Sequence, residues 1–339
     1  MMPHGVKLEQ NKSARSGRII RELPAPDGLP EPAPFAPCRR EPDASRILAA
    51  AERAGIRDET DGAPLREKLS ALAKRKPDLL VALCFDDDPV CSSEEAFSFE
   101  NAEKIADGLT LAATACRAGG TLAAVSRRDL RRMPAGSGLR TAAAGKRYPA
   151  AFFLLQKLRR QGKTAFFLGA QACAALSDAV REGLPQSRTV VTVAGDGVSG
   201  SGNWRVRIGT PLSALLKAAG APARPRFAAA GPAMTGRSVP DPAMPVTAAT
   251  RCVIVRKRAP RGRVFACVKC GRCASACPVG IVPWLVHREL ESGRPDPLLL
   301  FHVGDCIGCR ACDAVCPSGI SLAEEAGRAA ELKEGRRSP

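Results

Sequence analysis

Apolar and polar positions follow two rhythms between residues 43 and 186. Short, nearly continuous apolar runs predict buried strands at 79–85, 121–126 and 164–168. Longer mixed stretches predict helices at 43–53, 94–118, 148–161 and 170–182. Strands that alternate with helices of this length are typical of a parallel sheet with helices on its faces. The pattern therefore predicts an α/β domain over residues 43–186.

A different pattern begins at residue 187. It predicts one helix at 212–219 and strands at 188–194, 204–208, 226–230 and 251–255. Together these elements indicate a small α+β domain over residues 187–250. Three segments lack a regular pattern: an extended, proline-rich segment over 1–42, a basic surface loop over 127–147 and a polar tail over 331–339.

Length and hydropathy narrow the class of protein. A chain of 339 residues suggests two or three domains. It has no apolar run of about 18 residues, so no transmembrane helix is expected. Residues 1–21 are polar and basic and do not resemble a signal peptide. We therefore expect a cytoplasmic protein, or one attached peripherally to the cytoplasmic face of the inner membrane.

The formal net charge of +17 is densest over residues 256–263. Such a run is suited to docking an acidic electron carrier or to lying on anionic lipid head groups, and a plain solvated loop is the third interpretation. Nucleic acid is not an expected partner, because aromatic residues are only 4% of the chain and none interrupts the basic run.

Eight of the fourteen cysteines form two runs with the same spacing, C-x2-C-x2-C-x3-C-P. This is the spacing of the two-cluster bacterial ferredoxins, and it predicts two [4Fe-4S] clusters in an α-rich domain over residues 251–330. Three thiolates of one loop reach one cluster, while the fourth cysteine points away to the other cluster. We therefore expect Cys267, Cys270, Cys273 and Cys316 to hold cluster I, and Cys306, Cys309, Cys312 and Cys277 to hold cluster II.

Other uses of these cysteines fit the spacing less well. A zinc site needs four ligands in C-x2-C pairs, and a disulfide framework is typical of short secreted chains. His287 and His302 are not needed as iron ligands, because four cysteines already fill each cluster. The remaining thiols are predicted to be buried and free: Cys38, Cys84, Cys91, Cys116, Cys173 and Cys252.

Several short strings, taken in order, resemble one family. They are Val190-Val-Thr-Val-Ala-Gly-Asp196, Val206-Arg-Ile-Gly-Thr-Pro211, Gly231-Pro-Ala-Met-Thr-Gly236 and the two cysteine runs. This order resembles RnfC, a component of the ion-translocating ferredoxin:NAD oxidoreductase complexes, in a divergent and shortened form. More distantly it is similar to the cobalamin reductase of diol-utilising microcompartments and to the flavin subunit of respiratory complex I.

The resemblance implies an order of domains and of cofactors. The α/β region would correspond to the family's flavin domain, which holds FMN and accepts a hydride from NADH. The α+β region would be an SLBB-like β-grasp domain, and the clusters would take single electrons from the flavin. Other electron-transfer subunits, or a carrier of the ferredoxin or flavodoxin type, would be the partners.

Two departures bear on the flavin. The family's glycine-rich loop corresponds to residues 54–65, where Gly55 and Gly62 are kept but the interior glycines are replaced by Arg, Asp, Glu and Thr. A phosphate-cradling loop needs glycines so that its N–H groups can approach the anion, so an ordinary surface turn is the competing interpretation. The family's acidic motif at a strand end becomes Asp86-Asp87-Asp88, where Asp86 and Asp88 suit either ribose and ribityl hydroxyls or a solvated turn.

Three hypotheses follow from the sequence. The first is a non-catalytic electron-transfer subunit that relays single electrons through two clusters. The second is an FMN-containing NADH dehydrogenase subunit, with Gly55, Gly62, Asp86 and Asp88 at the cofactor. The third is a scaffold or redox sensor whose clusters only fold the C-terminal domain.

Overall fold

A computed structural model describes residues 19–38, 40–134, 136–222, 225–259, 262–293 and 302–335. The chain divides into two compact units, and most of it up to residue 257 belongs to the larger one. The smaller unit is built mainly from residues after 257. Parts of the predicted N-terminal segment (residues 1–18) and of the polar tail (residues 336–339) lie outside the described residues.

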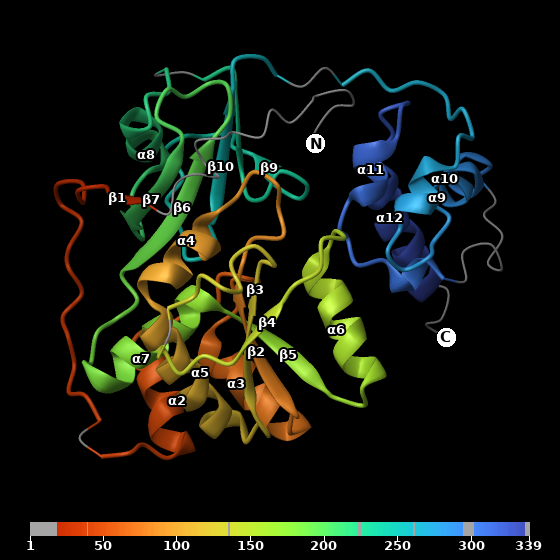
Figure 1. Ribbon diagram of the computed structural model, residues 1–339. Coiled ribbons are helices and arrows are strands. Elements are labelled where there is room, and N and C mark those ends of the chain that lie inside the picture. The colour runs from red at the N-terminus through yellow and green to blue at the C-terminus, as the bar shows by residue number, and fades with distance from the viewer. Residues whose placement is uncertain are drawn as a thin grey trace. The chain divides into compact units, whose positions relative to one another are not determined.

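The larger unit contains the predicted α/β domain (Figure 1). Its four strands are all parallel in the order β4-β3-β2-β5. They are β2 (Leu79–Cys84), β3 (Thr121–Val125), β4 (Thr141–Ala143) and β5 (Ala165–Gly169). The predicted parallel sheet is thus confirmed, but β4 lies inside the segment expected to be a loop. It is a three-residue edge strand of Thr and Ala, too short and too weakly patterned to stand out in the sequence.

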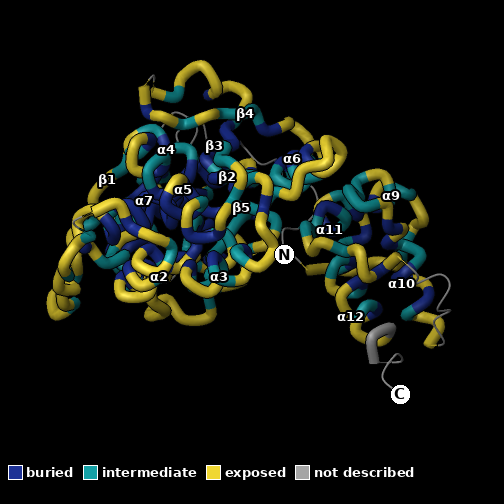
Figure 2. The backbone as a smooth tube through the Cα atoms, turned by 90° about the horizontal axis from the view of Figure 1, so that it is seen from below, coloured by how far each residue is buried: buried dark blue, intermediate teal, exposed yellow. Residues whose placement is uncertain are grey.

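Helices cover both faces of this sheet. Side chains of Leu80 and Ala82 point to one face and that of Val81 to the other, as the period of a strand requires. The first face packs against α2 (Ala44–Arg53), α3 (Leu65–Arg75), α5 (Ala102–Cys116) and α7 (Ala170–Arg181). The second face packs against α6 (Ala150–Arg160). Figure 2 shows β2, β3 and α7 mostly buried, with exposed positions along α2 and α3.

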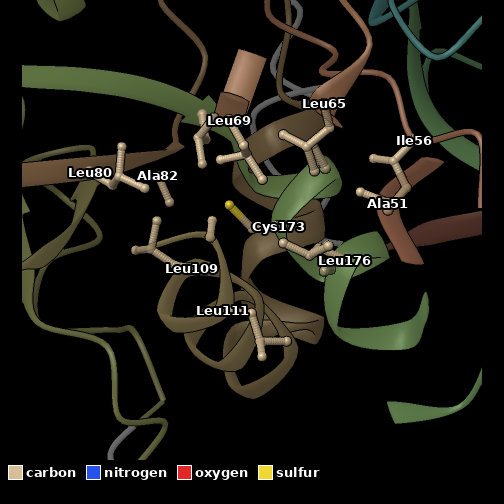
Figure 3. Packing of buried hydrophobic residues seen from close by; sticks show 14 of the residues in the cluster. Ala51, Ile56, Leu65, Leu69, Leu80, Ala82, Leu109, Leu111, Cys173 and Leu176 are labelled. Atoms are coloured by element: carbon tan, nitrogen blue, oxygen red, sulfur yellow. The ribbon is translucent and has the colours of Figure 1, made fainter. Parts of the chain in front are cut away.

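The core between sheet and helices is closed by a backbone contact. A Cβ atom added to Gly108 of α5 would lie 1.7 Å from the carbonyl oxygen of Cys173 in α7. The two helices therefore touch where glycine removes the side chain. Figure 3 shows the Cys173 side chain among Leu69, Leu109 and Leu176. Burial raises the pKa of the Cys173 thiol well above its usual value, so this cysteine acts as a small apolar side chain.

The single helix expected at 94–118 is two helices, which corrects the prediction. The first is α4 (Ser93–Glu100), and α5 follows after Asn101. Asn101 leaves helical geometry with φ −122° and ψ 24°. Its side-chain amide donates to the carbonyl of Phe97, which ends α4, and its own carbonyl accepts from the N–H of Ile105 in α5. One asparagine serves both helix ends, which the apolar pattern does not reveal.

A second, mixed sheet has six strands in the order β1-β7-β6-β10-β8-β9. They are β1 (Ile20–Glu22), β6 (Arg188–Ala194), β7 (Gly202–Arg207), β8 (Phe227–Ala230), β9 (Arg237–Ser238) and β10 (Cys252–Arg256). Helix α8 (Leu212–Ala218) packs on it through Leu212, Leu215 and Leu216. Two boundaries are corrected here. Strand β1 is a paired strand inside the proline-rich segment. Strand β10 pairs with β6 and β8, as expected for the strand at 251–255 of the α+β unit, so the domain boundary placed at 251 moves beyond β10.

The smaller unit is α-rich, as predicted. Its elements are α9 (Arg272–Ala276), α10 (Pro283–Glu291), the 3-10 turn η1 (Val303–Asp305), α11 (Ala311–Val315) and α12 (Leu322–Gly335). Two small apolar clusters hold it together, and both of them include cysteines of the two runs. Across the part of the chain that the structure describes, no helix combines the length and the apolar character needed to cross a membrane.

Candidate iron–sulfur centres

The eight cysteines of the two runs line two separate cavities in the smaller unit. Cavity I is lined by Cys267, Cys270, Cys273 and Cys316. Cavity II is lined by Cys277, Cys306, Cys309 and Cys312. Each cavity therefore takes three cysteines from one run and the fourth cysteine from the other run.

The crossing results from the local backbone. The third cysteine of each run lies on a five-residue helix, Cys273 on α9 and Cys312 on α11. The fourth cysteine ends that helix in an extended conformation, with φ −71° and ψ 120° at Cys277 and φ −74° and ψ 114° at Cys316. The chain turns away at this point, so the fourth thiol cannot join the other three.

Both cysteine loops follow the same path around their second cysteine. The residues on either side of that cysteine adopt left-handed backbone angles: φ is 52° at Lys269 and 74° at Gly271, and 64° at Gly308 and 58° at Arg310. Residues other than glycine rarely adopt this conformation, so the loop geometry is imposed by its surroundings. Such turns direct consecutive backbone N–H groups inward, which suits an anionic iron–sulfur cluster.

Apart from the thiols, the cavities are lined mainly by apolar side chains. Trp284, Ile320 and Leu322 border cavity I, whereas Ile281 and Ala326 border cavity II. Burial raises the pKa of the thiols of Cys273, Cys309 and Cys312. Iron must therefore displace protons that these thiols hold in the metal-free protein.

The donor set fits a cluster better than a single ion. Among the described residues, no three or more His, Cys, Asp or Glu side chains gather closely enough to hold one metal ion. The histidines have other partners: His287 Nδ1 lies 3.0 Å from a carboxylate oxygen of Glu325, and His302 Nδ1 lies 3.4 Å from Asp305. Four thiols line each cavity, and an all-sulfur ligand set suits an iron–sulfur cubane chemically.

Two of the three acidic residues after β2 cap helices. Asp86 accepts the N–H groups of Glu94 and Glu95 at the start of α4, at 2.9 and 3.2 Å. Asp87 accepts those of Ala150 and Ala151 at the start of α6. Asp88 is buried. Two of the three carboxylates thus neutralise the positive ends of helices, and Asp88 accepts the N–H groups of Val90 and Cys91 at 2.9 and 3.3 Å. Asp86 and Asp88 therefore already have hydrogen-bond donors within the chain.

The segment from Gly55 to Gly62 is a turn between α2 and α3 with exposed residues at Gly55, Arg57 and Asp61, but its two central acidic side chains are buried. Both glycines have left-handed backbone angles, φ 64° and 74°, but Asp58 is completely buried and Glu59 is 2% exposed. Their carboxylates point into the α/β domain and accept hydrogen bonds there. A phosphate group does not fit beside them, because like charges repel and the donors are already in use. The residues therefore do not fit FMN in the manner that the resemblance implies.

Sequence reasoning missed this buried polar group. Glu94, Gln171 and Lys68 join Asp58 and Glu59 inside the domain. No spacing marks these five residues, since they come from three distant segments. The only sequence signal is negative: acidic residues stand where a phosphate loop needs glycines.

Comparison with known proteins agrees with this geometry. Residues 266–320 match the family model described as a 4Fe-4S dicluster domain. The smaller unit thus contains a match to a domain that holds two iron–sulfur clusters, and the prediction of two [4Fe-4S] clusters is confirmed. Curated relatives then narrow the resemblance. The chain is similar to the RnfC component of the ion-translocating oxidoreductase complex of Rhodobacter capsulatus, with 34% identity over 118 residues, and to that of Erwinia tasmaniensis, with 34% over 135 residues.

These matches confirm the resemblance to RnfC over part of the chain only. They cover 34% and 39% of this chain, and 23% and 17% of the two relatives. The part of the chain that matches therefore spans less than a quarter of the length of these relatives. Among solved structures, the fold is similar to an NAD+-reducing [NiFe]-hydrogenase in the H2-reduced state and in the air-oxidized state. The TM-scores are 0.52 and 0.53 at 17% and 15% identity, over 86% of this chain and over 63% and 55% of those chains.

Proposed function

We propose that the protein is an electron-transfer subunit that relays single electrons through two [4Fe-4S] clusters. Cys267, Cys270, Cys273 and Cys316 would hold cluster I, and Cys306, Cys309, Cys312 and Cys277 would hold cluster II. The observation that carries the proposal is the crossed grouping of the thiols. It ties the two cavities into one small unit, as a relay between neighbouring clusters requires.

The clusters supply one-electron chemistry, and the chain tunes it. Apolar linings and partial burial keep water away from the sulfur atoms, and solvent exposure is one determinant of cluster potential. Cys270 is the exposed cysteine of cavity I, whereas the four cysteines of cavity II are half-buried. We infer that the two clusters have different potentials and that cluster I is the one closer to a partner.

The surface beside cavity I supports this direction. Val264, Phe265 and Val268 are 61–66% exposed, although large apolar side chains are usually covered. Phe265 is held in place, because its N–H donates to the carbonyl of Ser318 at 2.8 Å. Residues 262–272 contain three basic residues and no acidic one. We name the exposed segment 262–272 the cluster I rim.

An exposed apolar segment that also carries basic residues is suited to a carrier with an acidic docking face. We propose that the partner at the cluster I rim is such a carrier, of the ferredoxin or flavodoxin type, or an acidic subunit of a larger redox complex. Peripheral attachment on the cytoplasmic face of the inner membrane fits this role, since the relatives belong by name to an ion-translocating complex.

The two sheet domains have a proposed ancestry as well. The α/β domain over 43–186 would be a flavin domain that no longer uses its loop for phosphate. The six-stranded sheet would be an SLBB-like β-grasp domain over 187–250, extended by β1 and by β10. The cluster domain would then begin after β10 and continue to about residue 330.

Anaerobic reduction tests the proposal. The reconstituted protein is treated first with NADH, then with a reduced low-potential ferredoxin, and last with dithionite, while the broad cluster absorbance is followed. A relay is bleached by ferredoxin and dithionite, and NADH leaves it oxidised. Bleaching by NADH alone would indicate a working nucleotide site and favour the dehydrogenase. Clusters that are destroyed on reduction, without reversible cycling, would favour the scaffold.

A further inference from the structure

The ligand crevice of an open α/β sheet lies where the strand order reverses. Here the chain runs outward from β2 to β3 and β4 and then crosses back to β5 on the other side of β2. Ligands of such sheets bind at the carboxyl ends of the strands beside this reversal. In this protein the position is the end of β5, where Gly169 leads directly into α7.

The side chain of Glu59 fills this crevice. Its carboxylate accepts the N–H groups of Gln171 at 2.7 Å and of Ala172 at 2.9 Å, in the first turn of α7. A Cβ atom on Gly169 would lie 2.1 Å from the Glu59 carboxyl carbon, so glycine is required to admit it. Because α7 has 12 residues, its first turn carries the positive end of a full helix dipole.

Asp58 completes the arrangement with a lysine. Its carboxylate accepts from the N–H of Gly169 at 3.1 Å and from Lys68 Nζ at 2.6 Å. Lys68 Nζ also lies 2.8 Å from a carboxylate oxygen of Asp61, so two carboxylates of the loop, those of Asp58 and Asp61, neutralise its positive charge. Free N–H groups at a helix start, together with a lysine, are the donors that proteins offer to phosphate. Here every one of these donors faces a carboxylate of the chain itself.

We propose that the carboxyl group of Glu59, supported by Asp58, is a built-in ligand that occupies the oxyanion site of the α/β domain. The site is complete, but its ligand is covalently part of the loop. External phosphate groups, including that of FMN, are therefore excluded from the first turn of α7. Removal of the Glu59 side chain would leave a buried, donor-lined space for a small oxyanion. The inference concerns the α/β domain and does not depend on the clusters.

Chemical rescue tests this proposal on the full reconstituted chain. Glu59→Ala removes the carboxylate and is expected to lower the Tm of the larger unit by roughly 5–10 °C. Formate, acetate or inorganic phosphate, titrated against chloride at constant ionic strength, should then restore most of the loss with saturation. Wild type should show no such response, because its site is filled.

Two variants serve as controls. Glu59→Gln keeps the space filled, so it should lose stability without rescue by anions. Asp43→Ala removes an exposed carboxylate that caps α2, and its loss should not be restored with saturation, because the site is open to water. If Glu59→Ala folds only when formate or acetate is present, that result also supports the proposal.

Two results would overturn the inference. One is a Glu59→Ala variant whose stability does not change with any of the three anions. The other needs no variant: quenching of FMN fluorescence by wild type, competed by inorganic phosphate, would show that the site accepts an external phosphate. Neither result would bear on iron content or on reduction by ferredoxin, so this inference and the relay proposal fail separately.

Discussion

Pairs of cysteine substitutions decide how the two runs share their clusters. In the structure Cys277 faces the same cavity as Cys309, although it belongs to the run of Cys270. The double variant Cys277→Ala/Cys309→Ala therefore removes two ligands from cluster II and none from cluster I. We expect iron to fall from about eight to about four atoms per chain, since each cluster holds four.

The alternative pair reverses the expectation. Cys277→Ala/Cys270→Ala removes one ligand from each cavity, so both clusters are weakened and iron should fall well below about four atoms per chain. Iron and sulfide are counted after anaerobic reconstitution, and electron paramagnetic resonance of the reduced protein shows how many clusters remain. Cys38→Ala is the matched control, because this half-buried thiol lies outside both cavities. About four irons in the Cys277/Cys270 pair, with almost none in the Cys277/Cys309 pair, would refute the crossed assignment.

Four further predictions test other parts of the molecule. Gly108→Ala should destabilise the larger unit by about 3 kcal/mol in urea unfolding, because the added methyl group meets a backbone oxygen. The control Gly327→Ala on α12 has open space around the new methyl group and should stabilise the protein by up to about 1 kcal/mol. Equal effects of the two substitutions would contradict the contact between α5 and α7. Burial and the charge of Asp58 raise the pKa of Glu59 to about 7, above its usual 4.5. Between pH 4.5 and 7 Glu59 is therefore protonated in the folded state and largely ionised in the unfolded state. The free energy of unfolding of wild type should fall by about 3 kcal/mol relative to that of Glu59→Gln as pH rises from 4.5 to 7. A difference between the two proteins that does not change with pH would refute this. Phe265→Ser and Lys269→Glu on the cluster I rim should both slow reduction by an acidic ferredoxin in stopped-flow mixing. Only Lys269→Glu should also weaken the dependence of the rate on salt concentration, because it removes a positive charge. Unchanged rates would show that the ferredoxin docks at another surface. Removal of iron by a chelator should unfold the smaller unit, because its apolar clusters include the cysteines. Both sheets of the larger unit should stay protected in hydrogen exchange. Protection of α10 and α12 in the iron-free protein would show that the smaller unit folds without its clusters.

Much of the fold follows from local patterns. The run Arg188–Ala194 is rich in Val and Thr, and the strand has the predicted limits. Strand β4 was not predicted, because its three residues are Thr and Ala, which form a strand only by pairing with β3. The break between α4 and α5 at Asn101 was not predicted, because a capping side chain does not interrupt the periodicity of apolar residues in the two helices that it joins.

The cysteine spacing by itself determined the kind of cofactor and the number of clusters, because a tight loop can present three thiols to one cluster and must send the fourth elsewhere. The fate of the acidic loop was decided by the tertiary structure alone. Asp58 and Glu59 have the composition of a surface turn, yet they are buried, because their hydrogen-bond partners come from Gly169, Gln171 and Ala172, more than a hundred residues further along the chain. The local sequence around Asp58 and Glu59 does not contain these donors, because they come close to the carboxylates only after the sheet has formed. For this reason the sequence pattern predicted a turn, whereas the folded protein contains a closed anion site.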